Sequence, residues 1–156
     1  MPQAQTQQFG PVDYREEDAI EFPLGLPAFE EERRFLAIER QQTKPLVYLQ
    51  SLGRPELCFV TLPLSLVDPA YKLAVSSEDL RILGLTDFLE RGEQPEVGRD
   101  VEAYAIMSVT NSCPTANLLA PVLVRRLSRA GSRLGVQAIR MDGRYSHEHA
   151  WGAATC

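Results

Sequence analysis

The amino-acid sequence predicts a mainly β protein, a small antiparallel β-barrel-like domain with one or two short helices. About seven short apolar runs follow one another along the chain, separated by Pro, Gly and polar residues. Only one segment carries a clear helix-start signal, and strands do not alternate with long helical patterns. A sandwich or a small closed barrel fits this pattern better than βαβ units do.

Length and composition set the expected domain limits. The 156 residues are enough for one domain with a sizeable core. Residues 1–12 hold four glutamines and two prolines, so they are predicted to be a disordered tail. Residues 13–146 form the single barrel-like domain, and residues 147–156 form a C-terminal tail with little pattern.

The first half of the chain predicts four strands and one helical turn. The strands are expected over residues 19–22, 34–39, 46–51 and 57–62. The last two are joined by a segment with Gly53 and Pro55, which is typical of a hairpin turn. Pro27 is expected to open a short helical turn, because proline suits the first helical position.

The second half predicts one capped helix and four more β segments. Residues 71–75 are expected to be a strand, and Ser76 then caps a helix that ends near Leu83. Residues 101–109 alternate most clearly, with Val101 and Val109 on the same face. An apolar run over 118–124, bent at Pro121, and a strand over 136–141 complete the set.

No residue pattern indicates an enzyme or a cofactor. The chain lacks a nucleophile elbow, a P-loop and a dinucleotide fingerprint. Cys58 lies in an apolar run and is expected to be an inert core thiol, whereas Cys113 is expected in a turn over residues 111–114 and has no neighbouring base. The odd number of cysteines argues against a disulfide framework and fits a reducing cytosol. We therefore expect a non-enzymatic protein without a cofactor.

Metal and membrane binding are also not expected. His147, His149 and Cys156 offer metal-binding groups, but a structural zinc site needs four ligands and no second cluster is present. The longest apolar run, over 57–67, is broken by Pro63 and is too short to span a membrane. The N-terminus shows no secretory signal, so the sequence predicts a cytoplasmic location.

Charge is distributed unevenly, although the net charge is only −5. Eight acidic residues against one arginine lie between Asp13 and Glu32, whereas six arginines against one aspartate lie between Arg125 and Arg144. The first segment suits a basic partner. The second contains the residues on which direct nucleic-acid binding would depend: Arg125, Arg126, Arg129 and Arg133. Aromatic residues for base stacking are missing there, so solvated surface is the simpler interpretation.

An ordered set of short motifs resembles the flagellar assembly factor FliW family. The motifs are FPLGLPAFE from Phe22, YLQSL from Tyr48, FV-x-x-P from Phe59, DP-x-Y from Asp68 and TANLLAP from Thr115. The resemblance covers residues 20–145. It departs from the family at Ala28, where a glycine is usual, and in the arginine-rich connection before Gln137, which is longer and basic.

This resemblance implies a binding module rather than a catalyst. FliW proteins bind flagellin in the cytoplasm and antagonise the RNA-binding translational regulator CsrA without competing for its RNA. Flagellin and CsrA are therefore the expected partners, and neither nucleic acid nor membrane is. Complementary charge predicts that the acidic residues meet the basic partner, and the motif residues are expected to define the fold or the interface. The expected partner-binding residues are Glu16, Glu17, Asp18, Glu30, Glu31, Phe59, Pro63, Asp68, Tyr71, Asn117 and Pro121.

Overall fold

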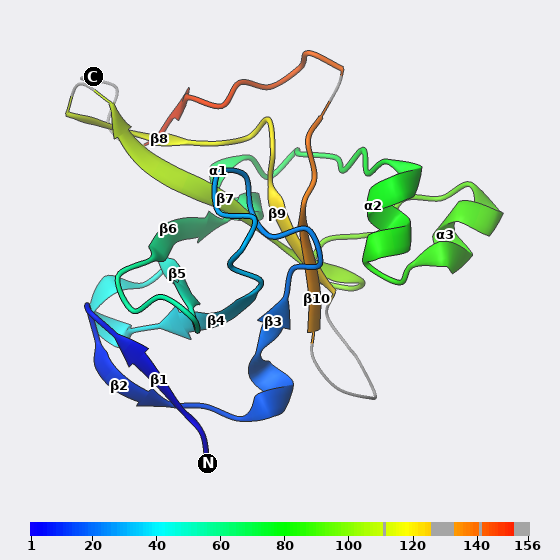
Figure 1. The fold of residues 1–156 in the computed structure, drawn as a ribbon. Helices are drawn as coiled ribbons and strands as arrows, with labels where there is room; N and C mark the ends of the chain where they lie inside the picture. Colours follow the sequence, from blue (N-terminus) through cyan, green and yellow to red (C-terminus); the bar gives the residue numbers. More distant parts are fainter. Residues whose placement is uncertain (111, 126–132, 141, 152–156) are drawn as a thin grey trace.

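The computed structural model describes residues 1–110, 112–125, 133–140 and 142–151, and its centre is a closed β-barrel (Figure 1). Within these residues, seven strands form the ring, in the order β7, β6, β5, β4, β3, β10, β9 and back to β7. The strands are β3 (Ile20–Glu21), β4 (Arg34–Glu39), β5 (Val47–Ser51), β6 (Cys58–Pro63), β7 (Val101–Thr110), β9 (Val122–Arg125) and β10 (Arg133–Gln137). The mainly β, barrel-like fold expected from the sequence is confirmed.

One pair of neighbouring strands departs from the antiparallel pattern of the barrel. β10 runs parallel to β3, with Arg133 opposite Ile20, whereas the other ring pairs are antiparallel. An odd number of strands cannot alternate in direction all the way around a closed ring. A seven-stranded closure therefore requires one parallel pair, and it falls where the chain's first ring strand meets its last.

The N-terminal residues form a hairpin, so the expected disordered tail at 1–12 is wrong. β1 (Gln3–Thr6) pairs with β2 (Gly10–Asp13), and the side chain of Ala4 is buried. The hairpin packs on the outer face of β4 and β5, where the ring of Phe9 meets Tyr48 edge-on at 4.9 Å. The glutamines that suggested disorder occupy exposed positions, and the small Ala4 and Thr6 face inward.

Short helices lie outside the barrel in the segment between β6 and β7. They are α1 (Leu64–Val67), α2 (Ser77–Ile82) and α3 (Thr86–Arg91), where the sequence predicted one or two helices. The described chain also has 3₁₀ turns at Glu16–Asp18 and Gln41–Thr43. The predicted cap is confirmed, since the Ser76 hydroxyl accepts a hydrogen bond from the amide of Asp79 at 3.1 Å. Residues 71–75 form no strand, and Pro27 opens a tight turn with Ala28 in the left-handed region rather than a helix.

Apolar side chains pack against both faces of the barrel wall. The interior is filled by a cluster that includes Phe22, Phe35 and Leu49. On the opposite side of the wall, the buried face of β7 packs under α2 and α3, and Val101 is fully buried. Val109 is instead 75% exposed. β7 continues past the ring there and pairs with β8 (Cys113–Ala116), which in turn pairs with β11 (His149–Ala150).

Candidate functional site

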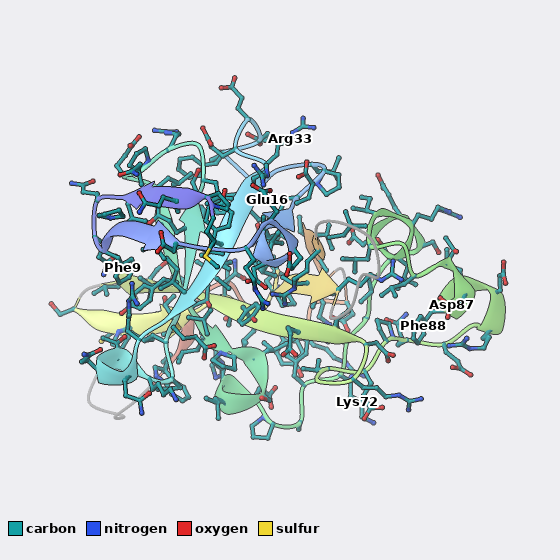
Figure 2. All side chains as sticks on the ribbon, turned by 90° about the horizontal axis from the view of Figure 1, so that it is seen from below. Phe9, Glu16, Arg33, Lys72, Asp87 and Phe88 are labelled. Carbon is teal, nitrogen blue, oxygen red and sulfur yellow. The ribbon has the colours of Figure 1, made fainter. Side chains whose placement is uncertain are left out.

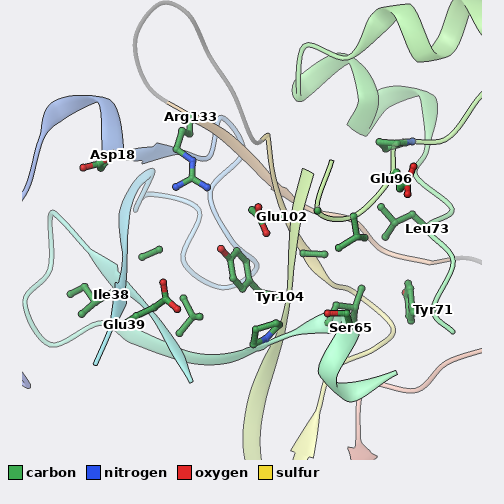
Figure 3. A pocket seen from close by; sticks show the side chains of 18 of the residues that line it. Asp18, Ile38, Glu39, Ser65, Tyr71, Leu73, Glu96, Glu102, Tyr104 and Arg133 are labelled. Atoms are coloured by element: carbon green, nitrogen blue, oxygen red, sulfur yellow. The ribbon is translucent and has the colours of Figure 1, made fainter. Parts of the chain in front are cut away.

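A long groove of about 1290 Å³ crosses one end of the barrel (Figure 3). It begins beside the N-terminal hairpin, passes over the barrel opening and ends between the segments 63–73 and 94–98. The groove carries an excess of negative charge, because six carboxylates and two cations line it. These residues are Asp13, Asp18, Glu39, Asp68, Glu96, Glu102, Lys72 and Arg133.

The strand register gathers four polar side chains at the barrel opening. Tyr104 stands opposite Pro63 on the interior face of β7. Glu102 comes two residues earlier and so lies on the same face of the strand. Glu39 is the last residue of β4, and Arg133 is the first residue of β10. In Figure 3 the guanidinium of Arg133 is turned toward the hydroxyl of Tyr104, with Glu102 beside them. The apolar interior thus ends in a polar mouth.

The mouth keeps the phenol of Tyr104 neutral. Burial is the main cause that raises the pKa of Tyr104, and the negative charges of Glu102 and Glu39 raise it further. Arg133 opposes them and lowers the pKa of the same group, both by its charge and by hydrogen bonding. Tyr104 therefore presents a hydroxyl that donates and accepts hydrogen bonds at neutral pH.

Beyond α1, the outer wall of the groove lacks regular structure and is held by a cluster around Arg140. This guanidinium is 6% exposed, pairs with Asp142 at 2.6 Å and donates to the carbonyl of Lys72. It lies about equally close to the stacked rings of Tyr71 and Tyr145, at 5.0 and 4.9 Å. The Tyr71 hydroxyl donates to the carbonyl of Leu118 at 2.7 Å, which ties the wall to the segment before β9.

Four of the expected partner-binding residues line this groove: Asp18, Pro63, Asp68 and Tyr71. Asp68 caps its own turn by accepting from the amide of Ala70 at 3.1 Å, so it fixes the path of the wall. Three residues that line the groove were not expected from the sequence: Glu39, Glu96 and Tyr104. Their signal was present in part, since Tyr104 fell on the less apolar face of the alternating segment 101–109.

Three other expected residues have structural surroundings. Phe59 packs edge-on against Phe29 at 5.6 Å and adjoins Phe35 in the barrel interior. Asn117 accepts from the amide of Ala120 at 3.0 Å, and Pro121 is buried with its carbonyl bonded to the amide of Ala138. These contacts hold the fold, and none of the three residues lines the groove.

The remaining expected residues lie on exposed turns at the end of the barrel near Arg33 and Arg34. Glu16 pairs with Arg34 at 2.8 Å, and Glu17 lies 3.6 Å from Arg15. Glu30 and Glu31 lie on the turn before β4, and Figure 2 shows Glu16 and Arg33 together, away from Asp87 and Phe88 of α3. Neighbouring arginines thus neutralise part of this acidic surface.

The described members of the arginine cluster do not form one surface. Arg133 faces the acidic mouth, whereas the Arg125 guanidinium lies against Gly84 at the end of α2. Arg126 and Arg129 lie outside the described residues. The two described arginines therefore offer no joint phosphate-binding face.

The two cysteines in the described part of the chain, Cys58 and Cys113, differ in chemical state. Cys58 is a free thiol whose pKa burial raises to about 11, which agrees with an inert side chain. Cys113 is disulfide-bonded, so it is not the free thiol that a nucleophilic role would need, and a disulfide is present although the odd number of cysteines argued against a disulfide framework. Cys156 lies outside the described residues.

Within the described ranges, no group of three or more His, Cys, Asp or Glu side chains is arranged to hold a metal ion. His147 lies beside Glu148, whereas His149 belongs to β11. No helix of the described residues is long and apolar enough to cross a membrane.

Comparison with known proteins finds one family. A family model described as FliW protein matches residues 3–151. The flagellar assembly factor FliW of Syntrophomonas wolfei is 34% identical over 142 residues, which cover 90% of this chain and 82% of that protein. The Geobacillus kaustophilus protein of the same name is 32% identical over 146 residues, covering 92% and 91%. A crystal structure of the flagellar assembly factor FliW matches with a TM-score of 0.80 and 27% identity, covering 99% of this chain and all of that one.

Proposed function

This chain belongs to the FliW family of flagellar assembly factors, and we propose that it is a non-enzymatic protein that binds flagellin and antagonises CsrA in the cytoplasm. In this proposal the protein acts by reversible protein–protein binding. Flagellin and CsrA are alternative partners, so export of flagellin frees the protein to bind CsrA. Membership of the family supports this choice of partners.

The acidic groove is the observation that best supports binding of a basic protein. Six carboxylates against two cations give it a strongly negative field, and a concave shape concentrates that field. Apolar side chains such as Leu36, Leu73 and Val97 line the same groove, so an amphipathic segment would find both charge and apolar contact. RNA-binding proteins carry the positive charge that such a groove attracts.

The groove is also built to keep its shape before a partner arrives. One wall is the hydrogen-bonded barrel, and the other is fixed by the Arg140 cluster and the Tyr71 hydroxyl. A preformed site loses less conformational entropy on binding than a loop that must first become ordered. Binding by this groove therefore needs no large rearrangement of the described residues.

Calorimetric titration of the purified protein with flagellin and with CsrA from the same cell tests the proposal. Binding to each, with one partner excluding the other, is the expected result. Affinity for CsrA should fall as salt is raised, because the field of the groove is screened. Binding to neither partner would show that the family's fold is present without its function.

Charge reversal locates the site within the molecule. Replacing Glu39 and Glu96 by lysine should weaken CsrA binding by roughly tenfold or more, because both carboxylates line the groove. The matched control is the double variant Glu90→Lys, Glu148→Lys, in which both residues are exposed and lie outside the groove. Equal losses for the groove and control variants would place the site elsewhere.

No observation favours direct nucleic-acid binding over this proposal. Arg133 of the arginine cluster faces carboxylates rather than an open surface. Phosphates would be repelled by the same groove that attracts a basic protein. A gel-shift experiment at low salt with a generic RNA should therefore show no retention.

A further inference from the structure

The first residue of β10 places a positive charge inside the negative groove. The amide of Arg133 donates to the carbonyl of Ala19 at 3.1 Å, and its backbone pairs in register with Ile20. These bonds place Arg133 beside Ala19 and Ile20, which directly follow the 3₁₀ turn of Glu16–Asp18. Its position is therefore set by the parallel strand pair that closes the barrel.

The side chain of Arg133 reaches the barrel mouth, where the carboxylates are most concentrated. It lines the groove together with Asp18, Glu39 and Glu102, and Figure 3 shows it between Asp18 and Glu102 with its guanidinium toward Tyr104. One polar atom of Arg133 is unpaired, because its buried Nε has no hydrogen-bond partner among the described residues. An unpaired buried donor costs free energy, so this arrangement is not the tightest that the mouth could hold.

From this placement we propose that Arg133 is a specificity-determining residue of the groove, an internal cation that a basic side chain of the partner must displace or approach. This inference rests on the proposed binding of a basic partner. Arg133 reduces the attraction of the mouth for weakly basic proteins. Only a partner with enough positive charge to compete with an intramolecular guanidinium binds tightly.

As a result, the groove binds a basic partner less tightly than its carboxylates alone would. An intramolecular cation is present at high effective concentration and needs no encounter, so it competes strongly with a partner in solution. Removing its charge should strengthen binding of a basic partner. If Arg133 instead donated to a carbonyl or carboxylate of the partner, its removal would weaken binding.

The variant Arg133→Gln tests the proposal by calorimetry against CsrA and against a short oligo-lysine peptide. We expect roughly threefold to tenfold tighter binding of both and a steeper dependence on salt, because one like charge is removed from the site. Arg133→Lys keeps the charge and should bind as the unaltered protein does. Arg91→Gln, on exposed α3, makes the same change in net charge and should have little effect.

A measurement without any partner separates this inference from the proposed function. Arg133 lowers the pKa of Tyr104, so Arg133→Gln should move the titration of that phenol to higher pH. Tyr104→Phe identifies the phenol in the absorbance titration. An unchanged Tyr104 titration, or a peptide affinity that is unchanged or weaker in Arg133→Gln, would overturn the proposal even if CsrA binds. Failure of CsrA to bind alongside tighter peptide binding would overturn only the identity of the partner.

Discussion

The rings of Tyr71 and Tyr145 stack with centroids 4.3 Å apart and planes 27° from parallel, although they come from distant parts of the chain. Arg140 lies against both rings and bonds to the backbone of the same wall. The stack joins the segment before α2 to the segment after β10. The groove wall therefore depends on residues near the C-terminus, not only on the segment that forms it.

Replacing Arg140 by glutamine should lower the free energy of unfolding by about 2–4 kcal/mol, because it removes a buried charge from several bonds and leaves their acceptors unpaired. Chemical denaturation measures the loss. Arg144→Gln is the matched control, since Arg144 lies 3.8 Å from the same Asp142 but its side chain is 72% exposed. Its expected effect is below about 0.5 kcal/mol. A loss at Arg140 no larger than at Arg144 would refute the role of the cluster.

Replacing Ala28 by glycine should stabilise the protein by roughly 0.5–1 kcal/mol. Ala28 has φ of 71° in the turn before β4, a region that costs a residue with a Cβ about 1–2 kcal/mol and costs glycine almost nothing. The gain is smaller than this strain because glycine is more flexible in the unfolded chain.

Ala70→Gly provides the control for that change. Ala70 is exposed in a turn and does not have a positive φ, so glycine there should destabilise by roughly 0.5–1 kcal/mol. The two variants should thus have opposite signs in the same denaturation experiment. Destabilisation by both would mean that Ala28 is not strained in solution.

Features that depend on local sequence could be predicted, whereas features that depend on closure of the barrel could not. The strand at 34–39 and the Ser76 cap follow from alternation and from a hydroxyl before a first turn, and both are confirmed. The parallel β3–β10 pair depends on the number of strands in the ring, and that number cannot be inferred from any single segment of the sequence. The N-terminal hairpin was missed because its inward residues, Ala4 and Thr6, are too small to give a hydrophobic pattern.

The candidate site was predictable only where charge or a turn motif marked it. Asp68 and Tyr71 belong to the family-like motif and do line the groove. Glu39 and Arg133 occupy strand ends that are far apart in sequence, and only the barrel register brings them to one mouth. Arg140 was grouped with the other arginines by charge. Its burial between two tyrosines depends on long-range packing.

Reversing Glu30 and Glu31 to lysine tests whether the exposed acidic turn contributes to CsrA binding. If it does, affinity should fall roughly fivefold to tenfold, and the salt dependence of binding should become shallower. Stability should change by less than about 0.5 kcal/mol, because both side chains are exposed. The double variant Glu90→Lys, Glu148→Lys makes the same change in net charge elsewhere. Unchanged affinity in Glu30→Lys, Glu31→Lys would confine the interface to the groove.

The thiol of Cys58 should make stability depend on pH in the alkaline range. Burial raises its pKa from 9.0 to about 11, so the unfolded chain loses the proton at lower pH than the folded protein does. Any stability linked to this group is therefore complete below pH 9 and is lost as pH rises from about 9 to about 11. The difference in unfolding free energy between the unaltered protein and Cys58→Ala should be constant from pH 7 to about 8. Above that range it should shift against the unaltered protein, and parallel curves up to pH 10.5 would show that the thiol is not desolvated.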